Sequence, residues 1–131
     1  MILADTSIWI DHFRSGDAVL AQHLDRGHIL IHPWIIGELA LGSLQNRTAL
    51  LTTLADLPTA LTASDTEVLG LIERHSLASI GIGIGIGIGI GYIDAHLLAS
   101  TLLTPDAALW TRDRRLHAAA QRLGLVTPSP A

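Results

Sequence analysis

Short apolar runs alternate along this chain with longer segments whose apolar residues recur every three or four positions. The short runs have the length of buried strands, and the periodic segments have the pattern of amphipathic helices. Strands are therefore predicted at residues 2–4, 28–32, 108–111 and 125–127, with a brief extended piece at 60–62. Helices are predicted at residues 8–15, 17–26, 33–42, 48–57, 64–75, 92–103 and 113–123.

Polar residues, glycines and prolines mark the predicted helix ends. Asp5 offers a capping carboxylate before the first helix, and Gly27 suits the C-terminal end of the second. Pro33 fits the first turn of the third helix. Ser64 and Glu67 have the spacing of a capping box at the start of the fifth.

The alternation of strands and helices favours an α/β fold with a central, mainly parallel twisted sheet and helices on both faces. In such a sheet, functional groups gather beyond the carboxyl ends of the strands, near the switch in strand order. Asp5 and Asp113 each follow a predicted strand. We therefore expect their side chains to meet at one edge of the sheet.

Residues 80–91 break the pattern with six consecutive Ile-Gly dipeptides. A helix there would contain six glycines, each about 1 kcal/mol less favourable than alanine. Alternation would place every isoleucine on one face of a strand, but glycine weakens that strand, and an exposed one would favour aggregation. We interpret the tract as an expanded loop inserted into the domain, in preference to a flap for substrate or partner.

The composition is that of a single domain spanning residues 1–131, with 49% hydrophobic residues. No apolar stretch is long enough to cross a bilayer, and the N-terminus lacks the basic region and cleavage site of a signal peptide. The chain has no cysteine, which excludes disulfides and thiolate metal sites. We therefore expect a cytoplasmic protein without a membrane partner.

Four carboxylates stand out because each lies against or inside an apolar run: Asp5, Glu38, Asp94 and Asp113. Burial of an unpaired carboxylate is costly, and four that converge repel one another. A divalent cation is the usual means of stabilising such a cluster, which indicates metal-assisted chemistry on a phosphate ester. Helix capping would explain Asp5 or Asp113 separately, but it explains neither Glu38 in mid-helix nor the set.

The formal net charge of −4 argues at first against nucleic-acid binding. The chain has twelve acidic residues, so the eight outside the cluster balance the eight basic residues, all of which are arginine. The excess negative charge therefore equals the charge of the cluster. A metal ion bound there would remove the repulsion of RNA.

Two other doubly wound folds also place an aspartate after the first strand. Response-regulator receivers and haloacid-dehalogenase-like phosphatases both use a lysine at the site, and this chain contains none. The phosphatases also need a second aspartate two residues after the first, where Ser7 stands here. Both alternatives are therefore much less favoured by the sequence.

Four segments, in their order and spacing, resemble the PIN domain, in particular the VapC-like toxins of bacterial toxin–antitoxin pairs. They are residues 2–10, 36–42, 92–99 and 109–113, and the likeness extends over nearly the whole chain. The resemblance implies a PIN-like three-layer α/β/α fold and an endoribonuclease that cleaves RNA with a metal-activated water. Family members usually have a short glycine-containing link where this chain has the Ile-Gly tract.

The resemblance also implies the roles of individual residues. The family's acidic metal-binding positions correspond to Asp5, Glu38, Asp94 and Asp113, with supporting hydroxyls at Thr6 and Thr111. Asp5 and Asp94 are expected to bind Mg²⁺ directly, with Mn²⁺ as a substitute. Glu38 is expected to bind the metal or orient water, and Asp113 to bind it directly or through water. The hard oxygen donors and the absence of cysteine agree with these ions.

Arg112, Arg114 and Arg115 surround Asp113 and are candidates for binding RNA phosphates. The other interpretation is that they form the solvated start of a helix. Trp9, Trp34 and Trp110 lie in apolar runs, so we expect them in the core rather than stacked on bases.

The resemblance implies several partners besides the RNA substrate. A VapB-like antitoxin is expected to lay a helix and an extended arm along an apolar groove and to block the metal site with a basic residue. A homodimer is expected, as is binding to promoter DNA through the antitoxin complex only. The alternative function is a catalytically idle PIN fold that binds protein or RNA, and the retention of all four acids argues against it. The sequence does not identify the RNA target.

Overall fold

The computed structural model describes residues 1–75, 77 and 90–127. Within this part of the chain, three parallel strands form one sheet in the order β2-β1-β3. The strands are β1 (Ile2–Ala4), β2 (Ile29–Leu30) and β3 (Ala108–Trp110). Leu3 of β1 lies opposite Leu30 on one side and Leu109 on the other. The strand order therefore switches at β1, where Asp5 follows.

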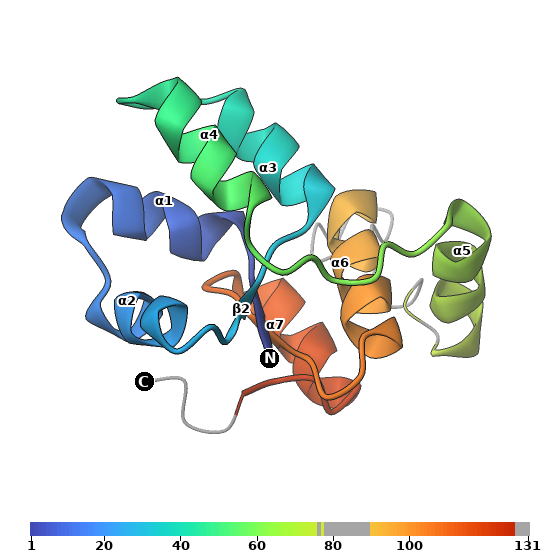
Figure 1. Ribbon diagram of the computed structural model, residues 1–131. Coiled ribbons are helices and arrows are strands. Elements are labelled where there is room, and N and C mark those ends of the chain that lie inside the picture. The colour runs from blue at the N-terminus through green and yellow to red at the C-terminus, as the bar shows by residue number, and fades with distance from the viewer. Residues whose placement is uncertain (76, 78–89, 128–131) are drawn as a thin grey trace.

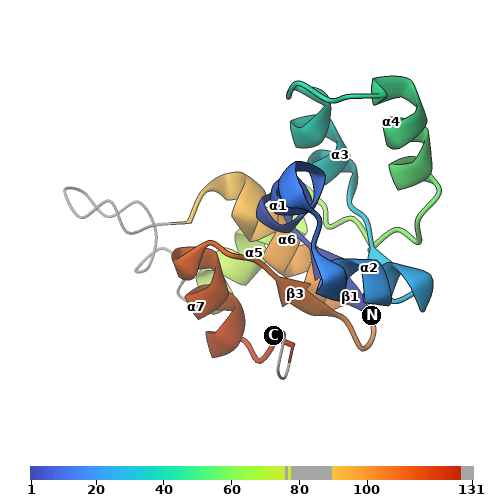
Figure 2. The same cartoon turned by 90° about the vertical axis from the view of Figure 1, so that its left-hand side faces the viewer.

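Helices cover both faces of this sheet, which confirms the predicted α/β architecture. In Figure 1, α1 and α2 lie on one side of the strands, α6 lies on the other with α5 outside it, and the α3–α4 pair stands beyond the carboxyl ends. In Figure 2, α7 lies beside β3, against which it packs. The helices are α1 (Thr6–Ser15), α2 (Ala18–Asp25), α3 (Pro33–Ala40), α4 (Arg47–Ala55), α5 (Asp65–Arg74), α6 (Tyr92–Leu103) and α7 (Arg114–Arg122).

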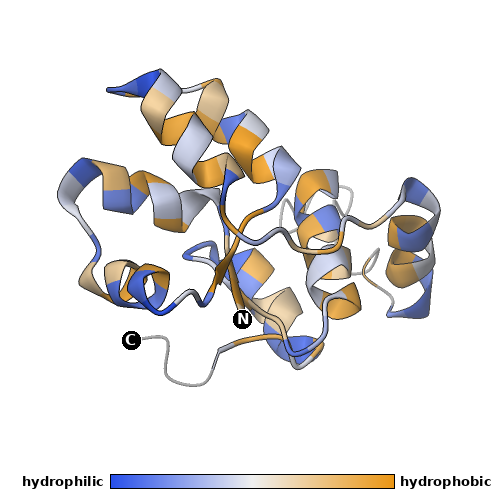
Figure 3. Cartoon of the chain, in the orientation of Figure 1, coloured by the Kyte–Doolittle hydropathy of each residue, from blue (hydrophilic) through white to orange (hydrophobic). Residues whose placement is uncertain are grey.

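The core consists of the strands and the helix faces turned toward them. Leu3, Ile29 and Leu109 are each at most 1% exposed. Figure 3 shows hydrophobic strands between helices whose surfaces are partly hydrophobic and partly hydrophilic. Trp9 and Trp110 are buried, as predicted. The amphipathic period of the helices therefore corresponds to a real division between core and solvent.

The predicted caps form as hydrogen bonds. The Asp5 carboxylate accepts from the first amides of α1, and Gly27 has a positive φ after α2. The capping box is complete, since Ser64 Oγ accepts from the Glu67 amide and the Glu67 carboxylate accepts from the Ser64 amide. Pro33 opens α3. These short-range signals set the observed helix bounds to within a few residues of the predicted ones.

The predicted strand at 125–127 is wrong in extent, because only one isolated bridge forms, between Leu109 and Val126. Gly124 turns the chain with a φ of 72°, and the Leu125 amide then donates back to the Ala120 carbonyl, which closes α7. The extended piece predicted at 60–62 is likewise reduced to a bridge between Ile31 and Thr59.

The Ile-Gly tract falls mostly outside the described residues, which include only Ile90 and Gly91 of it. The prediction of an expanded loop at 80–91 therefore lies outside the part of the chain that the structure describes. Gly91 is the N-cap residue of α6. None of the described helices has both the length and the apolar character that a membrane span requires.

Candidate active site

Asp5 occupies the carboxyl end of the central strand and is 6% exposed. One carboxylate oxygen, Oδ1, accepts from the Ser7 amide at 3.0 Å, from Ser7 Oγ at 2.5 Å and from the Ile8 amide at 3.4 Å. The other, Oδ2, accepts from Thr111 Oγ1. Burial raises the pKa of Asp5 and outweighs these hydrogen bonds, which lower it. Hydrogen bonds therefore hold the Asp5 carboxylate in place, but all of these donors are neutral and none cancels its negative charge.

Thr111 links Asp5, which follows β1, to Asp113, which follows the neighbouring strand β3. Its hydroxyl donates to Asp5 Oδ2 and accepts from the Asp113 amide at 3.0 Å. Asp113 caps α7, because its Oδ1 accepts from the Arg115 and Leu116 amides at 2.8 and 3.1 Å. Asp5 and Asp113 therefore lie at the same edge of the sheet, as expected, but Thr111 links the Asp5 carboxylate to the backbone of Asp113, not to its side chain.

Glu38 reaches the same edge from α3. Its Oε1 accepts a hydrogen bond of 2.8 Å from Thr6 Oγ1 at the start of α1, next to Asp5. The α3 helix is placed there because it begins directly after β2, with His32 as its N-cap. Glu38 is exposed, so its free lone pairs face solvent.

Asp94 lies in the first turn of α6 and is half-buried. Burial, followed by the charges of Asp113, Asp5 and Glu38, raises the pKa of its carboxyl to about 6, although a backbone hydrogen bond at Gly91 lowers it. Burial is the largest of these causes, and the neighbouring charges add to it because like charges disfavour a second ionised carboxylate nearby. The charges of the other three sequence-predicted acids therefore reach Asp94.

The four acids share this edge without forming a compact coordination group. Among the described residues, no three His, Asp or Glu side chains lie close enough together to hold one metal ion. The donors are nevertheless all carboxylate oxygens, the type that Mg²⁺ and Mn²⁺ prefer, and a cation would offset the charges that raise the pKa of Asp94. The chemistry of the site therefore fits a hard divalent ion.

An aromatic cluster that the sequence did not reveal lies at the start of α6, the helix that carries Asp94. The buried His96 ring lies 4.0 Å from the Trp34 ring and 4.8 Å from the Tyr92 ring, measured between centroids. Asp65 Oδ1 accepts from Tyr92 Oη at 2.9 Å and lies 3.0 Å from His96 Nε2. Trp34 is only half-buried and packs here, rather than in the central core. The cluster fixes α6 against α3 and α5.

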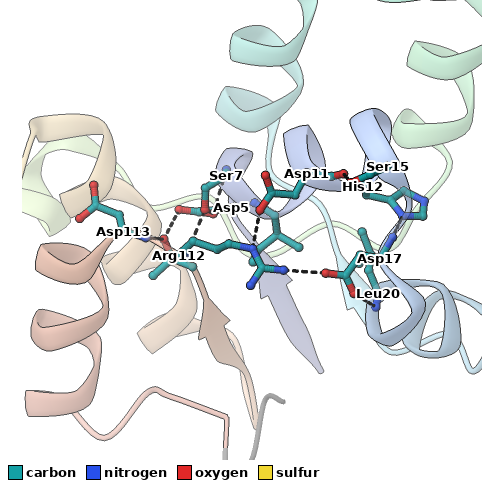
Figure 4. A network of polar contacts seen from close by, with 11 residues as sticks. Asp5, Ser7, Asp11, His12, Ser15, Asp17, Leu20, Arg112 and Asp113 are labelled. Carbon is teal, nitrogen blue, oxygen red and sulfur yellow. Dashed lines mark hydrogen bonds and ion pairs between the residues drawn. The ribbon is translucent and has the colours of Figure 1, made fainter.

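The three candidate arginines have different surroundings. Arg112 extends toward α1 and α2 and pairs with Asp11 at 2.5 Å and Asp17 at 2.6 Å (Figure 4). Arg114 and Arg115 are exposed at the start of α7. Sequence reasoning missed the role of Ser7, whose position two residues after Asp5 was the available signal.

Comparison with known proteins extends these observations to the whole chain. No family model matches the sequence. The chain is 43% identical over 125 residues to the protein named Ribonuclease VapC32 from Mycobacterium tuberculosis, both in strain CDC 1551 / Oshkosh and in strain H37Rv. The alignment covers 95% of this chain and 94% of each relative. The likeness therefore extends over nearly the full length of both chains.

Proposed function

Because the chain belongs to the VapC family of PIN-domain ribonuclease toxins, we propose that it is the toxin of a VapBC-type pair and cleaves RNA as a Mg²⁺-dependent endoribonuclease. The observation that carries the proposal is the position of Asp5, Asp113 and Glu38 together at the carboxyl edge of the sheet. The raised pKa of Asp94 agrees with it, since burial is its main cause and the charges of Asp113, Asp5 and Glu38 add to it. A concentration of negative charge at a sheet edge is unfavourable for a purely structural role and suits a metal-dependent phosphodiesterase.

In this proposal, Asp5 and Asp94 bind the metal ion, while Glu38 and Asp113 bind it or orient water. When bound, Mg²⁺ or Mn²⁺ would supply an activated water and neutralise the charge of the scissile phosphate. The remaining polar groups hold the acids in place. Thr111 and Ser7 donate to opposite oxygens of Asp5, and Thr6 donates to Glu38.

The direct test is incubation of the purified protein with total RNA in Mg²⁺, in Mn²⁺ and in EDTA, followed by mapping of the cleaved ends. We expect metal-dependent internal cleavage that leaves a 5′ phosphate and a 3′ hydroxyl. Asp5→Asn should abolish it, whereas Asp56→Asn, an exposed acid at the end of α4, should not change it. Cleavage that persists in Asp5→Asn would disprove the proposal.

A cellular experiment distinguishes the enzyme from an idle binding module. Expression of the wild-type chain should arrest growth, and the Asp5→Asn and Asp94→Asn variants should not. Arrest that persists in both folded variants would favour binding without catalysis.

The antitoxin partner is supported by a groove beside the site. A pocket of about 670 Å³ lies between α1, α3 and α4, lined by Ile10, Phe13, Leu39 and Leu50 and reaching Glu38. We propose that a VapB-like antitoxin seats apolar side chains there and places a basic residue against Glu38. Ile10→Asp, on the 38% exposed Ile10, should release the antitoxin in a pull-down while leaving RNA cleavage intact. Retention of the antitoxin by this variant would rule out the groove.

The family also supports three further proposals about assembly and location. We propose that the chain forms a homodimer, that the complex contacts promoter DNA only through its antitoxin, and that the toxin acts on RNA in the cytoplasm. Light scattering on the toxin alone, and DNA gel shifts with and without antitoxin, test the first two.

A further inference from the structure

The side chain of Arg112 leaves the carboxylate edge although its neighbours Thr111 and Asp113 both face it. Its Nε lies 2.5 Å from Asp11 Oδ2, and its terminal NH2 donates to Asp17 Oδ2 at 2.6 Å. Asp11 belongs to α1, and Asp17 is the N-cap of α2. One side chain from the loop after β3 therefore fastens that loop to two helices at once, as Figure 4 shows.

The backbone amide of Arg112 also contacts the site. The Arg112 amide donates to Ser7 Oγ at 3.0 Å, and Ser7 Oγ in turn donates to Asp5 Oδ1. Asp17 is fixed as well, because its other oxygen accepts from the Leu20 amide at 2.9 Å. Hydrogen bonds at both ends of Arg112, its guanidinium and its backbone amide, thus link Asp17 at the start of α2 to Ser7 and Asp5.

We propose, on the basis of the ribonuclease function above, that Arg112 is a positioning residue. Its pairing with Asp11 and Asp17 fixes the 111–113 loop, and this holds Thr111 and Asp113 in register with Asp5. Arg112 is then not a phosphate ligand, in contrast to the interpretation drawn from sequence.

The local charge supports positioning over phosphate binding. Two carboxylates beside one guanidinium leave a net negative charge, which repels a phosphate rather than attracting it. A phosphate would also have to replace charge-assisted hydrogen bonds that are already made by both Nε and a terminal nitrogen. Arg114 and Arg115, exposed nearby on α7, are the matched controls.

The decisive experiment compares Arg112→Gln with the double variant Asp11→Asn/Asp17→Asn, in which Arg112 is intact but unpaired. Both should lower kcat for a short RNA by about 10- to 100-fold, the cost of misplacing a reacting group by roughly an ångström, with KM nearly unchanged. The triple variant should be no worse than Arg112→Gln alone, because all three residues act as one unit.

A phosphate ligand would give the opposite pattern. Arg112→Gln would then raise KM and reduce the salt dependence of binding by about one unit of slope. The double variant would bind RNA as well as the wild type or better, and Arg112→Lys would retain function because lysine keeps the charge. Positioning predicts that Arg112→Lys fails too, since a single ammonium does not reproduce the planar fork that reaches both acids. Any of these phosphate-type results would overturn the proposal.

A second readout is independent of cleavage. Mn²⁺ affinity, measured by electron paramagnetic resonance, should fall in Arg112→Gln and in the double variant but not in Arg114→Gln or Arg115→Gln. Unchanged Mn²⁺ affinity in the first two would count against positioning. If Arg112→Gln fails to fold, the single Asp11→Asn variant removes one ion pair and should give the same kcat effect in smaller measure.

Different results would refute the ribonuclease function and the positioning role of Arg112. A wild-type protein without metal-dependent cleavage would refute the ribonuclease function and, with it, the positioning role. A wild type that cleaves while Arg112→Gln retains full kcat would refute the positioning role alone.

Discussion

Asp94→Asn is expected to abolish RNA cleavage and, at the same time, to stabilise the metal-free fold at neutral and alkaline pH. Burial and three neighbouring carboxylates raise the pKa of Asp94 from its ordinary value of 3.8 to about 6. The folded state therefore holds this proton more tightly than the unfolded state, so stability falls as the pH rises from about 4 to above 6. Asparagine has the same shape and no charge, so it escapes that penalty.

The size of the gain follows from the shift in pKa. Two units correspond to roughly 3 kcal/mol as an upper limit. Asp94 is only half-buried, and solvent screens its neighbours' charges, so we expect a gain of about 1–2 kcal/mol in the free energy of unfolding. The gain should be fully present at pH 8 and should vanish near pH 4, where the wild-type carboxyl is also neutral.

Guanidinium unfolding in EDTA, followed by tryptophan fluorescence at pH 8 and at pH 4.5, measures this difference. Other titrating groups affect both proteins alike and cancel in the comparison. Asp56→Asn, remote from the cluster, should show no comparable gain. In saturating Mn²⁺ the wild type should become more stable than Asp94→Asn, because metal binding stabilises the wild-type fold more than that of the variant. An Asp94→Asn variant that is no more stable at pH 8, or equally stabilised at both pH values, would refute the reasoning.

Three further predictions concern the supporting structure. His32 is fully buried, and burial together with the charge of His96 lowers its pKa to about 4. Urea titrations should therefore show that the free energy of unfolding falls by up to about 3 kcal/mol as the pH falls from 6.5 toward 4. The His32→Gln variant should lose less. Ser100→Ala removes the hydroxyl that lies 3.0 Å from His32 Nε2 and accepts from the Ala63 amide at 3.1 Å. The buried groups left without a partner should cost about 2–4 kcal/mol in chemical denaturation, and a cost below about 1 kcal/mol would contradict the assigned bonds. Ser64→Ala breaks the capping box and should cost about 1 kcal/mol in the same assay, whereas Ser64→Asp should be close to neutral.

The site acids were recognisable in the sequence because each is locally out of place. Asp5 and Asp113 follow strands, and Glu38 and Asp94 stand in apolar helices. Parallel strands bring their carboxyl ends to one edge, so the proximity of Asp5 and Asp113 could be derived from the order of elements alone. Asp94 stood out by its apolar surroundings alone, and only the structure shows that burial and the charges of the other three acids raise its pKa.

The groups that hold the acids were not recognisable in the same way. Ser7, Arg112 and Asp17 form one network, yet Arg112 is 105 positions from Ser7 and 95 from Asp17. An arginine beside a candidate metal ligand has the same local sequence whether it faces RNA or two aspartates of its own fold. The packing of the β3–α7 loop against α1 and α2 decides between these environments.

The sequence by itself determined the types of the elements, their order and most of their ends, because periodicity and capping bonds act over three or four residues. Only the tertiary structure decided the strand order, the reduction of residues 125–127 to a single bridge, and the pairing of Arg112. The physical reason is the distance along the sequence over which each interaction acts. A cap or a turn is fixed by neighbours in the chain, whereas the charge environment of Asp94 and the hydrogen bonds of Asp5 depend on segments brought together by burial of the core.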